Sequence, residues 1–175
     1  GRGVAGDRDR WIGLTGAACR EARIAGRDGE RHVPWGEPVR VHAGELVKLG
    51  RLGDGARSCL CVTGGIGVPE VLGSRSTLAG AGFGGFEGRP LRRGDVVPLG
   101  ASEREPRPEL GDVRTWLRSV LERRSLRVVP SLHTDRFPPD AMDRLMESEF
   151  TVGDQSNRVG LRLRGVEIPT PEDAG

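Results

Sequence analysis

The sequence predicts a mainly β protein, and two observations in its first hundred residues favour this class. Short apolar runs follow one another at a spacing of about 8–12 residues, with turn residues between them, as in β-sandwiches and barrels. Glycine accounts for 28 of the 175 residues and proline for 12, and both residue types are typical of tight turns. Few helical periods compete with this pattern, so we expect the first half of the chain to be built from strands.

The predicted strands of this half follow from apolar alternation and from the turns between them. The first strand ends at Gly16, and the second ends at the turn sequence GRDG. Ala43-Gly44 turns the chain into a later strand, in which we expect Leu46 to face the interior. A further strand follows the turn at Gly94-Asp95. The predicted strands span residues 11–15, 19–25, 38–42, 45–49, 57–63 and 96–99.

A charged, proline-containing segment, ASEREPRPELGD, follows the predicted strands and has the composition of a linker. Beyond it, apolar residues recur at the spacing of one helix face, at Val113, Trp116, Leu117, Val120 and Leu121. This spacing predicts a short amphipathic helix, with a solvated linker as the alternative. We divide the chain into a β-barrel-like domain over residues 1–104, a linker or short helix over 105–125, and the beginning of a second, incomplete domain over 126–175.

The last fifty residues mix strand and helix signals. Residues 126–129 form an apolar run that Pro130 ends, which predicts a strand. Pro138-Pro139-Asp140 opens a predicted helix whose apolar side holds Ala141, Met142, Leu145 and Met146. A hairpin is predicted between residues 150–152 and 159–163, with the polar sequence GDQSNR between the strands. These strands are too few to complete a β unit, so we expect open sheet edges.

Charge and hydropathy exclude several classes of protein. The net charge is only +2, and the arginines are scattered among acidic residues, so we do not expect nucleic-acid binding. No apolar run approaches the ~18 residues of a membrane span. No charged segment followed by an apolar one opens the chain, so we expect no secretory signal.

The three cysteines predict no disulfide framework. Cys59 and Cys61 are two residues apart on a predicted strand, and they therefore share one face. Neighbouring thiols on one face are poorly placed to bridge each other. We expect reduced cysteines that pack as small apolar side chains and a reducing, cytoplasmic compartment.

A glycine-rich segment over residues 80–85 matches the pattern G-x-G-x-x-G. In dinucleotide-binding proteins this pattern opens a helix, but here Gly88 and Pro90 follow and would prevent one. We expect a compact loop instead. Its backbone amides could bind an anion or carboxylate, and a purely structural role is the alternative.

Several ordered blocks around this loop carry a resemblance to a known family. They are VTGGI, VPEVLGSRST and GFGGFEGRPLRRGD, with WIGLTGA and VPWGEPVRVHAGELVKLG upstream and LRVVPSLHTDRF and SEFTVGDQSNRVGLRLRG downstream. Together they resemble the allophanate hydrolase subunit 2 family, also called the KipA or biotin-dependent carboxyltransferase family, which includes the C subunit of 5-oxoprolinase. Members of that family are longer at both ends, so we expect a piece of a larger protein or a truncated copy.

The resemblance implies a fold of β-barrel units similar to cyclophilin, in a cytoplasmic protein. It implies a KipI-like partner of the allophanate hydrolase subunit 1 family and a LamB-like subunit. One branch of the family belongs to bacterial ATP-dependent 5-oxoprolinase, with ATP used through the complex. A second branch is the carboxyltransferase part of urea carboxylase. Biotin would then have to be presented by another domain, since no biotin-attachment motif is present. A third branch binds a KipI-like kinase inhibitor without catalysis.

The candidate substrate-binding residues lie in two segments. The first segment supplies a guanidinium that could pair with a carboxylate, neighbouring hydroxyl and backbone groups, and a flanking ion pair. Its residues are Arg75, Ser76, Gly84, Gly85, Glu87 and Arg89. The alternatives are that Arg75 braces the loop and that Glu87 pairs with Arg89.

The second segment is the polar stretch between the last two predicted strands. The resemblance implies that Gln155, Ser156 and Arg158 face a shared substrate cleft, and a polar hairpin tip is the alternative. His133 and Asp135 are too few for a metal site, which needs three or more ligands. No nucleophile–base pair can be argued from spacing, so the catalytic residues stay unassigned.

Overall fold

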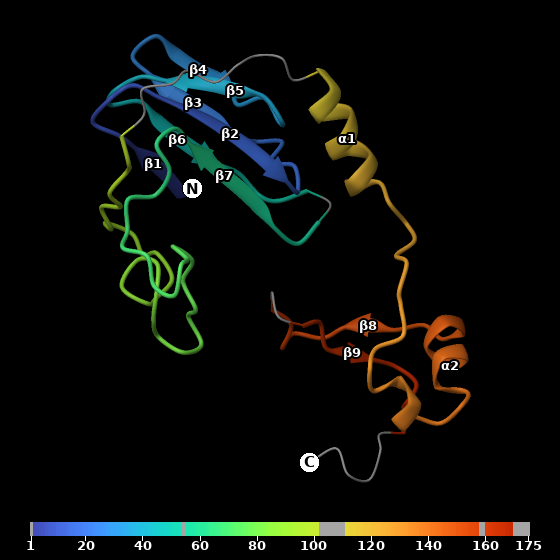
Figure 1. Ribbon diagram of the computed structural model, residues 1–175. Coiled ribbons are helices and arrows are strands. Elements are labelled where there is room, and N and C mark those ends of the chain that lie inside the picture. Colours follow the sequence, from blue (N-terminus) through green and yellow to red (C-terminus); the bar gives the residue numbers. More distant parts are fainter. Residues whose placement is uncertain (1, 54, 102–110, 158–159, 170–175) are drawn as a thin grey trace. The chain divides into compact units, whose positions relative to one another are not determined.

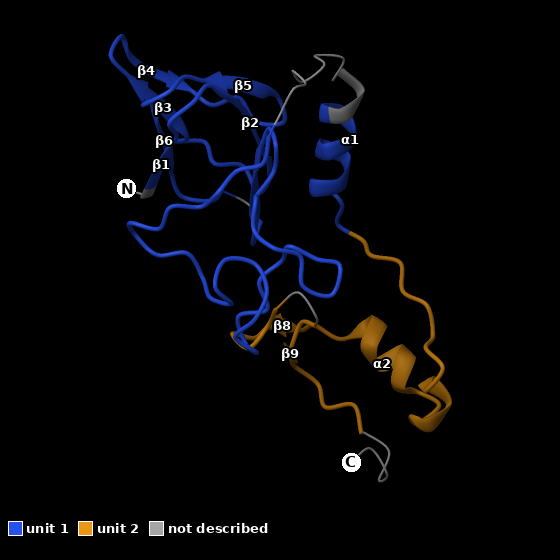
Figure 2. Cartoon of the chain, turned by 60° about the vertical axis from the view of Figure 1, so that its left-hand side comes forward, with its two compact units in different colours: residues 1–124 blue, residues 125–175 orange. Residues whose placement is uncertain are grey.

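The computed structural model of the protein describes residues 2–53, 55–101, 111–157 and 160–169 (Figure 1). The chain divides into two compact units, residues 1–124 and residues 125–175 (Figure 2). The predicted mainly β class is confirmed, because the described residues form nine strands, all paired antiparallel, and two α-helices.

The first unit contains two antiparallel sheets. A four-stranded sheet has the order β1-β6-β3-β4, and a three-stranded sheet has the order β5-β2-β7. In chain order the strands are β1 Arg2–Ala5, β2 Arg10–Gly16, β3 Arg23–Gly26, β4 Gly29–His32, β5 Pro38–Val41, β6 Leu46–Leu49 and β7 Ser58–Val62. β1 and β4 were not predicted, and β3 begins later than the predicted strand over residues 19–25.

The apolar core of this unit lies between the two sheets. Its fully buried members come from β2 and β5 of one sheet, from β3 and β6 of the other, and from the connecting segments. They are Ile12, Leu14, Cys19, Ala22, Ile24, Val33, Val41 and Val47. Burial of apolar surface, worth about 25 cal/mol per Å², therefore holds the two sheets together.

The predicted inward orientation of Leu46 is wrong. Val47 is 4% exposed and Leu46 is 36% exposed. β6 pairs Val47 with the buried Ile24 of β3, and this register directs Val47 into the core. Successive residues of a strand point to opposite faces, so Leu46 must point outward.

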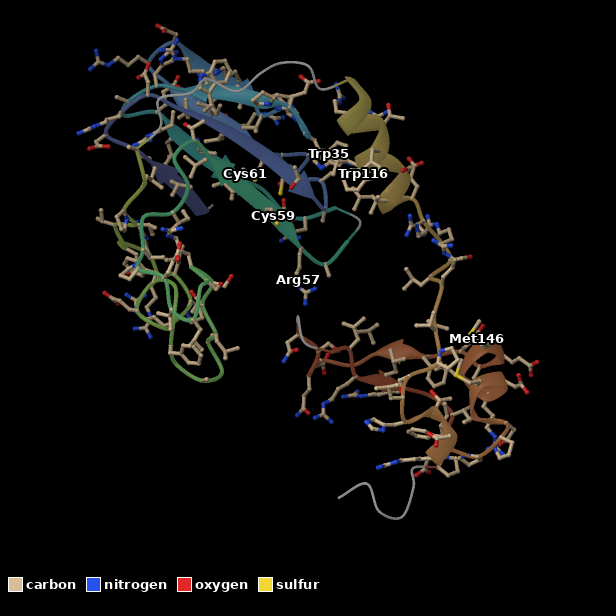
Figure 3. All side chains as sticks on the ribbon, in the orientation of Figure 1. Trp35, Arg57, Cys59, Cys61, Trp116 and Met146 are labelled. Atoms are coloured by element: carbon tan, nitrogen blue, oxygen red, sulfur yellow. The ribbon has the colours of Figure 1, made fainter. Side chains whose placement is uncertain are left out.

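The cysteines are all free, but only one of them packs as expected. Cys19 is buried, whereas Cys59 and Cys61 are exposed on β7 (Figure 3). β7 is an edge strand, and its last residue, Val62, packs against the core. The two cysteines alternate with Val62 along the strand and therefore lie on the opposite face. The expectation of packed thiols is wrong for this pair.

The exposure of Cys59 and Cys61 predicts a graded reaction with a thiol reagent. In the native chain, dithionitrobenzoate should modify these two cysteines quickly and Cys19 only after unfolding, because reaction requires an accessible thiolate. The double variant Cys59→Ser/Cys61→Ser should lose the fast phase entirely. Fast reaction of Cys19 in that variant would show that the core described above is not formed.

The predicted amphipathic helix is confirmed as α1, Gly111–Leu121. It contacts the segment that precedes β5, where Arg114 forms an ion pair with Glu37. A Cβ added to Gly36 would lie 3.3 Å from the Arg114 side chain and 3.6 Å from that of Leu117. Trp116 is 62% exposed, so the apolar face of α1 is only partly covered by the described residues (Figure 3).

The second unit is small. It contains a short 3₁₀ helix at Thr134–Arg136, the predicted helix as α2 at Ala141–Glu147, and a hairpin of β8 Thr151–Val152 with β9 Leu163–Arg164. The predicted strand over residues 126–129 is wrong, because these residues are exposed and pair with no strand among the described residues. A strand without a partner leaves its backbone groups to the solvent.

The hairpin itself is confirmed, but its second strand begins later than predicted. Asn157 N donates to Gly160 O at 3.0 Å, and Gly160 N donates to Asn157 Oδ1 at 3.1 Å. These bonds join Gly160, which the prediction placed in the second strand, to Asn157 and not to a residue of β8. In the first unit, the predicted strand over 96–99 is likewise only a single bridge between Ile66 and Leu99, and Pro98 has no N–H to extend it. None of the described helices has the length and apolar character needed to cross a bilayer.

Candidate functional site

The segment over residues 64–100 is a long loop that follows β7 in the first unit. Two backbone bonds close its ends, from Gly67 N to Pro98 O at 2.7 Å and from Gly100 N to Gly65 O at 3.0 Å. Arg10 of β2 donates to the carbonyl oxygens of Gly100 and Thr63 at 2.9 and 3.2 Å. The loop is therefore fastened at its base to the three-stranded sheet.

Arg75 directly follows the turn that the bridge between Val71 and Ser74 closes, and its side chain is half-exposed. Its Nε donates to the carbonyl oxygen of Val68 at 3.1 Å, and its guanidinium pairs with Glu70 at 2.8 Å. These two contacts support the alternative interpretation, in which Arg75 braces the loop. The guanidinium is nevertheless 55% exposed, so it is also accessible to a ligand. Its role in substrate binding stays a prediction.

The loop brings Ser76 together with Gly84 and Gly85. A Cβ on Gly84 would lie 2.6 Å from Ser76 O, and a Cβ on Gly85 would overlap the side chain of Thr77. Both glycines have positive φ, 72° and 55°, a region that other residues rarely adopt. Only glycine fits at positions 84 and 85. The Ser76 part and the glycine part of the predicted site therefore lie against each other.

Arg89 is the centre of an ion-pair cluster. Its guanidinium contacts Glu87 at 2.6 Å and Asp95 at 2.8 Å, and it lies 5.3 Å from the ring centre of Phe86. The hydrogen bond from Arg89, followed by that from the Arg92 amide, lowers the pKa of Asp95 to about 2. The pairing of Glu87 with Arg89 is thus observed. Arg89 is neutralised within the loop.

The pKa of Asp95 predicts how the loop responds to acid. A carboxyl group whose pKa is lower in the folded state stabilises that state above its unfolded pKa of about 3.9. We therefore expect the urea midpoint of the first unit to decrease as the pH falls from about 4 to about 2. Asp95→Asn should lower the midpoint at pH 7 and flatten this dependence.

All three tryptophans lie in residues 1–124, so their fluorescence reports on the unfolding of this unit. Asp7→Asn is the matched control, because Asp7 is exposed and has no hydrogen bond or ion pair among the described residues. An unchanged pH dependence in Asp95→Asn would contradict the contribution assigned to the Arg89 cluster.

The second predicted segment lies on the β8–β9 hairpin of the other unit. Gln155 lines a pocket of about 290 Å³ with Gly153, Arg162, Leu163 and Arg164. Ser156 Oγ accepts a hydrogen bond from Arg162 N at 2.9 Å, so Ser156 positions the strand. Arg158 lies outside the described residues.

Sequence reasoning missed Arg162 and Arg164. The sequence LRLR did carry a signal, because charged residues at every second position share one face of a strand. The two predicted segments belong to different units. Among the described residues, no cluster of three or more His, Cys, Asp or Glu side chains could hold a metal ion.

The sequence pattern of one protein family matches residues 3–174, nearly the whole chain. The family is described as the carboxyltransferase domain, subdomains A and B. This chain belongs to that carboxyltransferase-domain family. The resemblance seen in the loop and hairpin blocks is thereby confirmed.

The chain is similar to proteins of two kinds, 5-oxoprolinase subunits and urea amidolyases. The chain is 38% identical over 159 residues to the C subunit of 5-oxoprolinase from Escherichia coli, a match that covers 91% of this chain and 48% of that protein. It is 32% identical over 153 residues to urea amidolyase of Lachancea kluyveri, covering 78% of this chain and 8% of the relative. The crystal structure of K. lactis urea amidolyase matches 97% of this chain and 11% of its own, with 26% identity and a TM-score of 0.73. This carboxyltransferase-domain chain thus spans about half the length of its 5-oxoprolinase relative.

The described residues offer no attachment site for biotin, a cofactor that the resemblance to biotin-dependent carboxyltransferases implies. Lys48 is the only lysine of the chain. It lies inside β6, which is paired with β1 on one side and β3 on the other, and its Nζ forms an ion pair with Glu30. A lysine side chain that is held by an ion pair inside a sheet is unsuited to carry biotin on a mobile arm.

Proposed function

We propose that this chain is part of the C subunit of an ATP-dependent 5-oxoprolinase, a cytoplasmic hydrolase that opens 5-oxoproline to glutamate. The observation that supports this most strongly is the 38% identity, over 91% of the chain, to a protein that carries this name. The urea amidolyase relatives reach only 32% and 31%. Activity is expected in a complex with KipI-like and LamB-like subunits.

The loop of the first unit suits the recognition of a small carboxylate. In the reaction, water adds to the lactam carbonyl carbon, the ring C–N bond breaks, and the nitrogen gains a proton. ATP would supply the driving force, and its site is assigned to the assembled complex. Arg75 would hold the substrate carboxylate through its planar guanidinium. Ser76 and the Gly84–Gly85 amides would surround it. These glycines fix the loop before the substrate arrives.

A second candidate is a urea-type, biotin-dependent carboxyltransferase. The match to K. lactis urea amidolyase, with a TM-score of 0.73 over 97% of the chain, favours it. In that case a carboxyl group would move from carboxybiotin, presented by another domain, to a nitrogen of urea. The same guanidinium and amide groups would then face a carboxylated intermediate.

One assay separates the two candidates. The full-length protein is mixed with its partner subunits, and glutamate release from 5-oxoproline is followed with and without ATP. We expect ATP-dependent release. A complex that assembles but releases no glutamate, and instead carboxylates urea when a biotin carboxylase is added, would establish the second candidate. A complex that does neither would favour a binding role, like that of a KipA-like protein with a KipI-like kinase inhibitor.

A further inference from the structure

The β8–β9 hairpin holds a second cationic site that the proposed function does not use. The strands pair Thr151 with Arg164 and Val152 with Leu163, and Gly153 N continues the ladder by donating to Arg162 O at 2.7 Å. Arg162 and Arg164 are two residues apart and therefore share one face of the hairpin. Both line the same pocket on this hairpin.

The glycine opposite Arg162 provides the room for this pocket. Gly153 contributes no side chain, and a Cβ added there would lie 3.4 Å from Arg164 Nε and 3.3 Å from Arg162 O. The Arg164 side chain thus lies close against the Gly153 backbone. Ser156 holds the Arg162 amide from the other side of the turn, at 2.9 Å. The backbone around the two arginines is therefore fixed by hydrogen bonds.

Both arginines are exposed and have few protein partners among the described residues. Among the described residues, the Arg162 guanidinium has no hydrogen bond or ion pair. In the described part of the chain, the one charged partner of Arg164 is Asp154 at 3.9 Å; that side chain is 97% exposed, so the pair is weak. Arg89 in the first unit, by contrast, is held by two carboxylates. Each guanidinium carries five N–H donors, and most of those in the hairpin face solvent and not a protein acceptor.

We propose that Gly153, Gln155, Arg162 and Arg164 form a binding site for a small oxyanion, a carboxylate or a phosphate. Two guanidinium groups can each bind two oxygens of such a group, and the Gln155 amide adds a further donor. A pocket of about 290 Å³ suits a small ligand of this kind. The site is independent of the Arg75 loop, and it requires neither ATP nor a partner subunit.

The test is an NMR titration of the ¹⁵N-labelled 175-residue chain at constant ionic strength. Inorganic phosphate is the probe in one arm, acetate in the second, and chloride serves as the reference. We expect saturable shifts at Gly153, Gln155, Arg162 and Arg164 with phosphate or acetate and none with chloride. The arm that saturates at the lower concentration identifies the oxyanion that is preferred.

Variants separate a built site from general attraction to arginine. Arg162→Gln should weaken binding by about ten-fold or more, the loss expected for one charge-assisted contact. Gly153→Ala should weaken it without a change in charge, because the methyl group crowds Arg164. Arg136→Gln, an exposed arginine of the same unit, should leave it unchanged. The spectrum of each variant confirms its fold. Equal shifts at all arginines, or binding that survives Arg162→Gln, would overturn the proposal.

Discussion

Arg75→Ala should reduce the turnover of 5-oxoproline by the full-length complex by about a hundred-fold while the subunits still assemble. The guanidinium is half-exposed and is the group that we assign to the substrate carboxylate. Loss of a charge-assisted, bidentate contact to a reacting ligand costs about 2–4 kcal/mol in transition-state binding. The measurement is kcat/KM for glutamate release, with assembly followed by size-exclusion chromatography.

Arg75 also braces the loop, so the control must remove the brace and keep the guanidinium. Glu70→Gln removes the ion pair of this brace, at 2.8 Å, and leaves the hydrogen bond from Arg75 Nε to Val68 O. We expect Glu70→Gln to retain most of the turnover. Arg93→Ala, a neighbouring exposed arginine without a side-chain hydrogen bond or ion pair among the described residues, should retain all of it. Equal losses in Arg75→Ala and Glu70→Gln would show that Arg75 acts only as a brace.

Gly88→Ala should destabilise the glycine-rich loop by about 2–4 kcal/mol. Gly88 has a φ of 66°, and a Cβ there would overlap the backbone of Gly82. A backbone clash cannot be relieved by a rotamer change, so the turn itself must open. Hydrogen exchange at the amides of Leu78 and Gly88, which are bonded to Phe83 O and Gly84 O at 2.9 and 3.0 Å, measures this opening directly.

Two other glycines of the loop separate the free-energy cost of a positive φ from the cost of steric overlap. Gly94 has a φ of 93°, but an added Cβ would meet nothing within 4 Å, so Gly94→Ala should cost only the backbone penalty of about 1–2 kcal/mol. An added Cβ at Gly80 is equally free, and its φ is not positive, so Gly80→Ala should be close to neutral. The same exchange rates in Gly88→Ala and Gly80→Ala would contradict the tight packing of the loop.

The sequence was sufficient to predict elements whose partners are close along the chain. The helix α1 follows from its apolar spacing, and the β8–β9 hairpin follows from two short runs around a polar turn. The face of β6 was mispredicted because Leu46 and Val47 are both apolar. Only the pairing of Val47 with Ile24, a contact between distant residues, decides which of them is buried. The apolar run over 126–129 was mispredicted because apolar residues alone do not supply a partner strand.

The candidate site, too, was predictable from the sequence only in part. The need for glycine at positions 84 and 85 was visible as a flexible, glycine-rich run, and the structure explains it by the contact with Ser76 and Thr77. The cluster of Arg89 with Asp95 was missed, since the segment between them carries no helix or strand period. Arg162 and Arg164 were missed as well, because their shared pocket depends on Gly153 across the hairpin.

Hydrogen exchange of the assembled full-length complex, with and without 5-oxoproline, tests most directly whether the 64–100 loop binds the substrate. We expect the amides of residues 75–89 to exchange more slowly when the substrate is present, and those of the β3–β6 pair to be unaffected. A complex that turns over 5-oxoproline with no change of exchange in residues 75–89 would show that the substrate binds elsewhere.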